Sequence, residues 1–265
     1  MGIYKNLFSG LNRAALIPFF VIGDPDEETS FELIQTAIDA GADVLELGIP
    51  FSDPVADGPT IQKADIRAMK AKMTPQKALT LIKRITDYRP IPIGLLVYYN
   101  LIYQYGVEQF FAAFKAAGGT SVLVADLSID DAEEVAPAAE AAGLETVFMV
   151  TPNTTDQRIR KIAEYTTGFI YTVSLLGTTG QRSGLSDLVK PLIGRLRSLT
   201  EKPICVGFGI STAEHARDVA QEGADGVIIG SRIIKFIEDN LDDTDTMKKQ
   251  ISGYIQEVAK EIARP

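Results

Sequence analysis

Short runs of apolar and β-branched residues alternate with longer segments of helical periodicity along almost the whole chain, and this pattern constrains the fold most. The predicted strands span residues 15–22, 43–48, 92–98, 121–126, 145–150, 168–175, 203–207 and 225–230. The predicted helices span residues 28–40, 75–88, 107–117, 130–142, 156–165, 188–199 and 212–221, and helix-prone sequence follows the last strand. Strands this short and continuously apolar are typical of parallel strands covered on both faces.

A repeated phrase marks the return from helix to strand. It occurs as Ala40-Gly41-Ala42-Asp43-Val44, Ala117-Gly118-Gly119-Thr120-Ser121-Val122 and Glu222-Gly223-Ala224-Asp225-Gly226-Val227. Each copy predicts a helix that ends at a glycine shortly before a strand. Eight strand–helix units without a linker predict a (β/α)8 barrel over residues 1–265 as a single domain, with an extra N-terminal helix. The rival is an open doubly wound sheet. It would place GxGxxG after the first strand, where this chain has Ile22-Gly23-Asp24-Pro25-Asp26.

Composition excludes several classes of protein. The chain has 265 residues and a net charge of −9, which argues against nucleic-acid and anionic-membrane partners. A small phosphorylated substrate remains possible, because backbone N–H groups can bind it. Cys205 is the only cysteine, so no disulfide can form within the chain. No apolar run approaches the roughly 18 residues of a membrane span. Because the N-terminus also lacks a signal-peptide core, we expect a cytoplasmic protein.

Glu46 is the first candidate for chemistry. In the strand 43–48 it lies near the C-terminal end, where barrel enzymes place their active sites. Because both faces of a barrel strand are covered, the carboxyl group is expected to be buried, and burial raises its pKa toward neutrality. The alternative is a structural glutamate that pairs with an arginine or with backbone donors.

Asp57 is the second candidate. It follows Glu46 by 11 residues, in a loop over residues 49–60 that contains three prolines. The two carboxyl groups are therefore predicted to face one substrate, with one transferring protons and the other stabilising charge. Taken alone, Asp57-Gly58 is a common turn dipeptide, and turn formation is then the simpler interpretation.

Glycines after the last two predicted strands indicate a phosphate site. Gly207-Phe208-Gly209 follows one strand and Gly230-Ser231 the other, where barrels often bind phosphate. The glycine-rich segment 176–184 is predicted to be a lid, or alternatively a slack connection. His215 lies in a predicted helix below the mouth, and neither CxxC nor HExxH occurs, so no metal site is predicted.

These motifs together resemble the tryptophan synthase α subunit family. The shared segments, in order, are Pro18-Phe19, Gly23-Asp24-Pro25, the stretch from Leu45 to Gln62, Gly177-Thr178-Thr179-Gly180 and Gly207-Phe208-Gly209-Ile210. The resemblance covers nearly the whole chain. It implies a (β/α)8 lyase that cleaves indole-3-glycerol phosphate into indole and glyceraldehyde 3-phosphate, a step of L-tryptophan biosynthesis.

The same resemblance assigns roles to residues. It implies Glu46 and Asp57 as the catalytic pair, and it places Thr179 in the lid that closes toward Asp57. The substrate-binding residues that it implies are Phe19, Leu96 and Tyr171 around the indole ring, and Phe208, Gly180, Gly209, Gly230 and Ser231 on the phosphate side.

The resemblance also implies a partner. The family works with a pyridoxal-phosphate-dependent β subunit in an α2β2 complex, so no cofactor is expected in this chain. Ser128, where the family often has proline, and Thr178, where valine is usual, depart from the pattern and bear on loop rigidity and partner signalling. Two alternatives stay open: another phosphate-binding barrel, such as a phosphosugar isomerase or indole-glycerol-phosphate synthase, and a catalytically silent subunit that only activates its partner.

Overall fold

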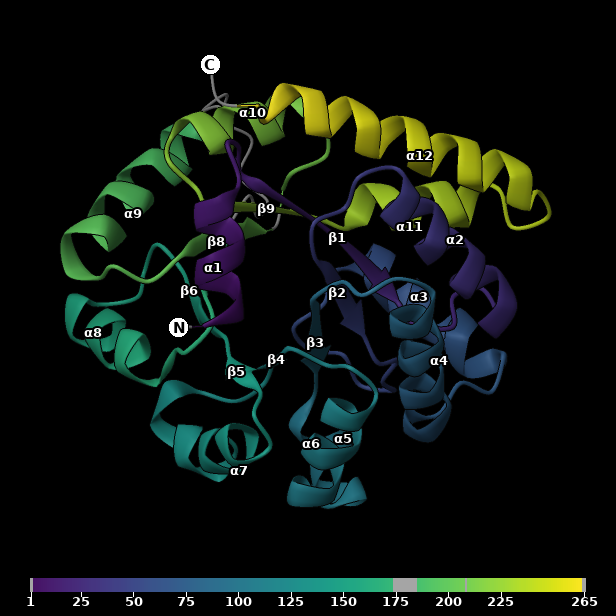
Figure 1. Cartoon of the computed structure of the whole chain (residues 1–265), viewed down its shortest axis with the longest axis horizontal. Helices are drawn as coiled ribbons and strands as arrows, with labels where there is room; N and C mark the ends of the chain where they lie inside the picture. The colour runs from purple at the N-terminus through teal and green to yellow at the C-terminus, as the bar shows by residue number, and fades with distance from the viewer. Residues whose placement is uncertain (1, 174–184, 208, 264–265) are drawn as a thin grey trace.

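A computed structural model describes residues 2–173, 185–207 and 209–263, and Figure 1 shows its strands enclosed by helices. The strand pairs are parallel, as the short apolar runs predicted. The strands are β1 Ala15–Val21, β2 Leu45–Gly48, β3 Ile93–Val97, β4 Ser121–Val124, β5 Glu145–Thr146, β6 Phe148–Val150, β7 Ile170–Val173, β8 Ile204–Gly207 and β9 Gly226–Ile229.

The sheet closes into a barrel. Its order is β5-β4-β3-β2-β1-β9-β8-β7-β6, so β5 and β6 stand at the two ends of the order. Only Val147 separates these two strands in the chain, and its N–H still bonds the carbonyl oxygen of Val122 at 3.0 Å. The predicted strand 145–150 is therefore β5 and β6 together, and the predicted (β/α)8 barrel is confirmed.

Helices surround the strands in Figure 1. Predicted helices 75–88 and 156–165 are found with the same bounds. The bounds of the other predicted helices shift by one to three residues, except for the segment 130–142. The α-helices in the described part of the chain are α1 Ile3–Gly10, α2 Glu27–Asp39, α3 Pro59–Lys70, α4 Pro75–Tyr88, α5 Tyr99–Tyr105, α6 Val107–Ala116, α7 Ala136–Ala141, α8 Asp156–Tyr165, α9 Leu185–Leu199, α10 Ala213–Gln221, α11 Ser231–Asp239 and α12 Thr244–Glu261.

The prediction of one helix over residues 130–142 is wrong. The segment forms a 3-10 helix, η1 Ile129–Glu134, followed by the short helix α7. Pro137 lies in the first turn of α7, and because proline has no N–H it cannot continue a hydrogen-bonded helix from η1. Two further helices, α3 and α5, were not predicted from the sequence. Both begin directly at the mouth of the barrel, α3 after a proline-rich loop and α5 two residues after β3.

The repeated glycine phrase is a turn, as predicted. Gly41, Gly118 and Gly223 have φ angles of +112°, +99° and +96°, in the left-handed region that favours glycine. Each glycine ends the path from an outer helix and returns the chain to the start of a strand. The repeat therefore sets the βα alternation that closes the barrel.

The extra N-terminal helix α1 covers the end of the barrel where the strands begin. The fully buried Tyr4 bonds Ser121, at the start of β4, at 2.8 Å between hydroxyl oxygens. The backbone N–H of Ile3 donates to Glu145 at the start of β5. Because α1 closes this end, a substrate must enter from the opposite end. No helix in the described ranges is long and apolar enough to cross a membrane.

Candidate active site

A pocket of about 210 Å³ opens where the strands end, on the face opposite α1. The first turn of α3 and the first residue of α11 complete its wall. The described residues that line it are Phe19, Glu46, Asp57, Gly58, Pro59, Thr60, Ile61, Leu96, Tyr171, Gly209, Ile210, Ile228, Gly230 and Ser231. None of them is a lysine, arginine or histidine.

Glu46 lies at the bottom of this pocket. It pairs in register with Phe19 of β1 and Gly94 of β3, and its residue is only 4% exposed. The Tyr171 hydroxyl donates a hydrogen bond to Oε2 of Glu46 at 3.5 Å. Burial raises the pKa of Glu46 to about 8, opposed by that hydrogen bond and assisted by the negative charge of Asp57. The carboxyl group is therefore mostly protonated near neutral pH.

Asp57 approaches the pocket from the loop after β2. The Tyr98 hydroxyl donates to Oδ2 of Asp57 at 2.6 Å and accepts from the backbone N–H of Ala56 at 3.1 Å. The side-chain amide of Gln62 donates to the backbone carbonyl oxygen of Asp57 at 2.8 Å. Burial raises the pKa of Asp57, and the Tyr98 hydrogen bond opposes that rise. Tyr98 thus holds the carboxyl group, and Gln62 holds the backbone of the same residue.

Apolar and aromatic side chains form the rest of the deep wall. Phe19, Leu96, Ile228 and Tyr171 contribute from four strands. A Cβ atom at Gly207 would lie 2.3 Å from the Tyr171 hydroxyl oxygen, so only glycine leaves room for this tyrosine. Because Tyr171 contacts Glu46, the absence of a side chain at Gly207 also preserves the surroundings of that carboxyl group.

A helix N-terminus supplies donors for an anion. α11 begins at Ser231 after Gly230, and no side chain caps its first N–H groups. Gly230 and Ser231 both line the pocket together with Gly209, whose φ is +80°. Free backbone N–H groups and the helix dipole favour a phosphate at this position.

Eight of the residues predicted from the sequence meet in this one pocket. They are Glu46, Asp57, Phe19, Leu96, Tyr171, Gly209, Gly230 and Ser231. Thr179, Gly180 and Phe208 lie outside the described residues, as does the whole predicted lid, residues 176–184. His215 lies in α10 and does not line the pocket.

Several residues that line the pocket were not predicted from the sequence. Those in the first turn of α3 directly follow Asp57 in the chain, and a prediction of a helix after Gly58-Pro59 would have found them. The structure also assigns Tyr98 a contact with Asp57 across 41 residues, which no local pattern contains. The missed lining residues are Gly58, Pro59, Thr60, Ile61, Ile210 and Ile228.

A parallel barrel with one buried and one half-buried carboxyl group and a helix N-terminus in one pocket defines a class, the barrel enzymes that act on small phosphorylated substrates by proton transfer. Within the described ranges, no three His, Cys, Asp or Glu side chains cluster as a metal site.

Comparisons with known proteins agree. The family model described as tryptophan synthase alpha chain matches residues 7–263. The curated tryptophan synthase alpha chain of Methanothermobacter thermautotrophicus is 47% identical over 248 residues, which is 94% of this chain and 92% of that protein. That of Methanoregula boonei is 42% identical over 260 residues, 98% of each chain. This chain belongs to the tryptophan synthase alpha chain family.

Solved structures give the same result. A chain of the tryptophan synthase α2β2 complex from Pyrococcus furiosus has a TM-score of 0.87 and 38% identity, covering 94% of this chain and 98% of that one. The tryptophan synthase subunit alpha of Legionella pneumophila has a TM-score of 0.91 and 30% identity, covering 99% and 98%. The family is that of a lyase-type enzyme subunit, and its alpha reaction cleaves indole-3-glycerol phosphate to indole and glyceraldehyde 3-phosphate.

Proposed function

We propose that Glu46 and Asp57 catalyse the alpha reaction in this chain. One observation carries the assignment: the two carboxyl groups share a pocket in which no described residue offers a cation to neutralise them. A carboxyl group held in this way is available for proton transfer or for stabilising a developing positive charge. Cleavage of indole-3-glycerol phosphate needs both.

Glu46 supplies the proton transfers. With a pKa of about 8 it is protonated near neutral pH, so it donates a proton to C3 of the indole ring. The resulting carboxylate then takes the proton of the glycerol hydroxyl as the carbon–carbon bond breaks. The bonding electrons return to the indole ring, and the hydroxyl-bearing carbon becomes the aldehyde of glyceraldehyde 3-phosphate. Glu46 ends the cycle protonated, as it began.

Asp57 stabilises the charge that forms between these two transfers. Protonation at C3 makes the ring nitrogen N1 positive, and a carboxylate beside its N–H lowers the energy of that state. The short bond from Tyr98 and the bond from Gln62 to the backbone hold Asp57 in one place. A fixed carboxylate needs no reorganisation when the charge develops.

The remaining groups orient the substrate. Phe19, Leu96 and Tyr171 offer apolar surface for the indole ring, and the N-terminus of α11 at Ser231 takes the phosphate. The apolar surface for the indole ring and the N-terminus of α11 line the same pocket as Glu46 and Asp57. Binding of the substrate at both ends therefore places the scissile bond over Glu46.

The partner is the β subunit of tryptophan synthase, which holds pyridoxal phosphate, and this chain needs no cofactor of its own. The Pyrococcus furiosus relative is described as part of such a complex. Exposed apolar side chains surround the mouth of the barrel here: Val55 in the loop after β2 is 72% exposed, and Tyr103 in α5 is 63% exposed. An interface at this mouth would cover both and would receive indole directly.

The test is indole release from indole-3-glycerol phosphate by the full chain, alone and with a tryptophan synthase β subunit. Indole formation that the β subunit stimulates supports the proposal. A chain that releases no indole in either case, yet activates the β subunit, would instead be a silent partner.

A further inference from the structure

Behind the site lies a buried carboxyl group that does not line the pocket. Asp65 is in α3 and is 4% exposed, and its Oδ2 is buried with no hydrogen-bond partner among the described residues. Such a group is unusual, because an unsatisfied buried oxygen is destabilising. Burial raises its pKa to about 8; the charges of Asp57 and Asp24 add to the rise, and the Phe51 backbone amide opposes it.

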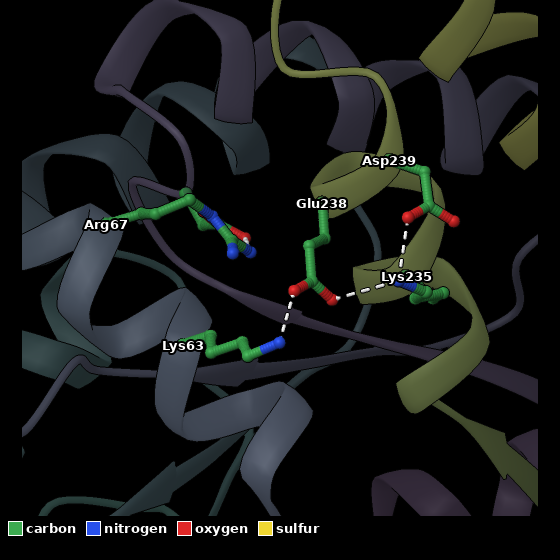
Figure 2. Close-up of polar contacts among 6 residues, drawn as sticks. Lys63, Arg67, Lys235, Glu238 and Asp239 are labelled. Carbon is green, nitrogen blue, oxygen red and sulfur yellow. Dashed lines mark hydrogen bonds and ion pairs between the residues drawn. The ribbon is translucent and has the colours of Figure 1, made fainter.

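Arg67, two residues further along the same helix, does not neutralise Asp65, because side chains two residues apart on a helix do not face each other. Its guanidinium bonds both oxygens of the buried Asp24, at 2.6 and 2.8 Å. Figure 2 shows a second ionic group of α3, in which Lys63 bonds Glu238 of α11 at 2.6 Å. The helix that carries Asp65 is thereby tied to the end of β1 and to α11.

A continuous path of contacts connects Asp65 with Asp57. The backbone N–H of Phe51, at the start of the loop after β2, lies near enough to the Asp65 carboxyl group to oppose the rise in its pKa. The Phe51 ring stacks on Tyr98, with centroids 4.9 Å apart and ring planes at 24°. The Tyr98 hydroxyl then donates to Asp57 at 2.6 Å.

We propose that Asp65 is a positioning residue for the alpha reaction: it fixes the loop after β2 at Phe51, and the Phe51–Tyr98 stack carries that constraint to the carboxylate of Asp57. The proposal rests on the function proposed above for Asp57. Asp65 does not touch the substrate, since it does not line the pocket. Its acceptor oxygen, and not its charge, is the working part.

The test compares Asp65→Leu, which removes the acceptor and keeps the branch at Cγ, with Asp65→Asn, which keeps an acceptor oxygen for Phe51. We measure indole release by the full chain with the β subunit, and the affinity for glycerol 3-phosphate by calorimetry. Asp65→Leu is expected to lower kcat about tenfold, because a displaced catalytic group reacts more slowly. KM and the glycerol 3-phosphate affinity should change less than about twofold, and Asp65→Asn should restore kcat to within about threefold of the wild type.

A double-mutant cycle with Tyr98→Phe separates positioning from a general structural effect. If both residues act through one path, Asp65→Leu should lower kcat little further once Tyr98 has lost its hydroxyl. Glu238→Gln is the matched control: it loosens α3 from α11 and leaves the Phe51 contact in place, so kcat should stay unchanged.

Three outcomes would overturn the proposal: equal losses in Asp65→Leu and Asp65→Asn, fully additive losses in the cycle, or a Glu238→Gln loss as large as that of Asp65→Leu. If Asp65→Leu fails to fold, Asp65→Ala takes its place in the cycle. A wild-type chain that releases no indole would instead refute the proposed function, so the two failures are distinguishable.

Discussion

Two carboxyl groups at each end of the barrel are held in opposite ways. At the end where strands begin, Asp43 accepts the backbone N–H of Leu16 at 2.7 Å and pairs with Arg13 through two nitrogens. Asp225 accepts the N–H of Ile204 at 2.8 Å and pairs with Arg197. At the end where strands finish, Glu46 and Asp57 bond only tyrosine hydroxyls among the described side chains.

This difference separates stability from chemistry. A carboxylate that bonds both an arginine and a backbone N–H holds two strand starts together through charge-assisted hydrogen bonds. A buried carboxyl group without a cation has a raised pKa, which disfavours its charged form but poises it for proton transfer. Asp43 and Asp225 occupy the same place in two copies of the repeated phrase, so the structural role repeats around the barrel and the catalytic role proposed for Glu46 and Asp57 does not.

The largest effect is expected at Glu46. Glu46→Gln keeps the size of the side chain but removes its proton transfers, so kcat for indole release should fall by at least about 10³-fold. The affinity for glycerol 3-phosphate should stay within a few fold, since α11 is untouched. Full activity in this variant would contradict the mechanism.

Asp57→Asn is expected to have the next largest effect. Loss of a fixed charge beside the indole nitrogen should lower kcat by about 10²-fold. KM should change little, because the charge is needed mainly after C3 is protonated. A higher KM with normal kcat would reassign Asp57 to substrate binding.

The pH dependence of stability tests the setting of Glu46 directly. Its pKa is raised from 4.5 to about 8, so between these values the folded state binds more protons than the unfolded state. The free energy of unfolding must therefore decrease as pH rises through this window. Relative to Glu46→Gln, the wild type should lose about 2 kcal/mol between pH 6 and pH 8 in urea unfolding experiments. Parallel pH curves would show that Glu46 is not buried as a neutral acid.

Asp43→Asn should show the smallest effect, and it should change the stability of the protein and not its activity. The pair with Arg13 is partly exposed, with side chains 20% and 13% accessible, so we expect a loss of about 1–2 kcal/mol in stability. Asp225→Asn at the more exposed pair should lose less. Indole release at a temperature where both variants are folded should match the wild type. A lower kcat would break the division between the two ends.

Much of the fold and half of the site follow from local patterns. Apolar runs and left-handed glycine turns such as Gly41 are encoded within a few residues, so the strands and the barrel are predictable. The burial of Glu46 also follows, because alternation in one strand and the barrel as a whole determine it. The break at Pro137 was equally visible in the sequence, yet the helical composition around it suggested a continuous helix.

Contacts between distant segments are different. Tyr98 and Asp57 are 41 residues apart, Tyr171 and Glu46 are 125 apart, and only packing decides which tyrosine meets which carboxyl group. Asp65 is one of 35 acidic residues in the sequence, with no motif to distinguish it. The tertiary structure alone shows that it is buried behind the active site, because burial and the resulting pKa depend on every element packed around a group. The sequence by itself therefore determined the barrel and the position of Glu46 in β2, and tertiary packing decided how Asp57 is held in place.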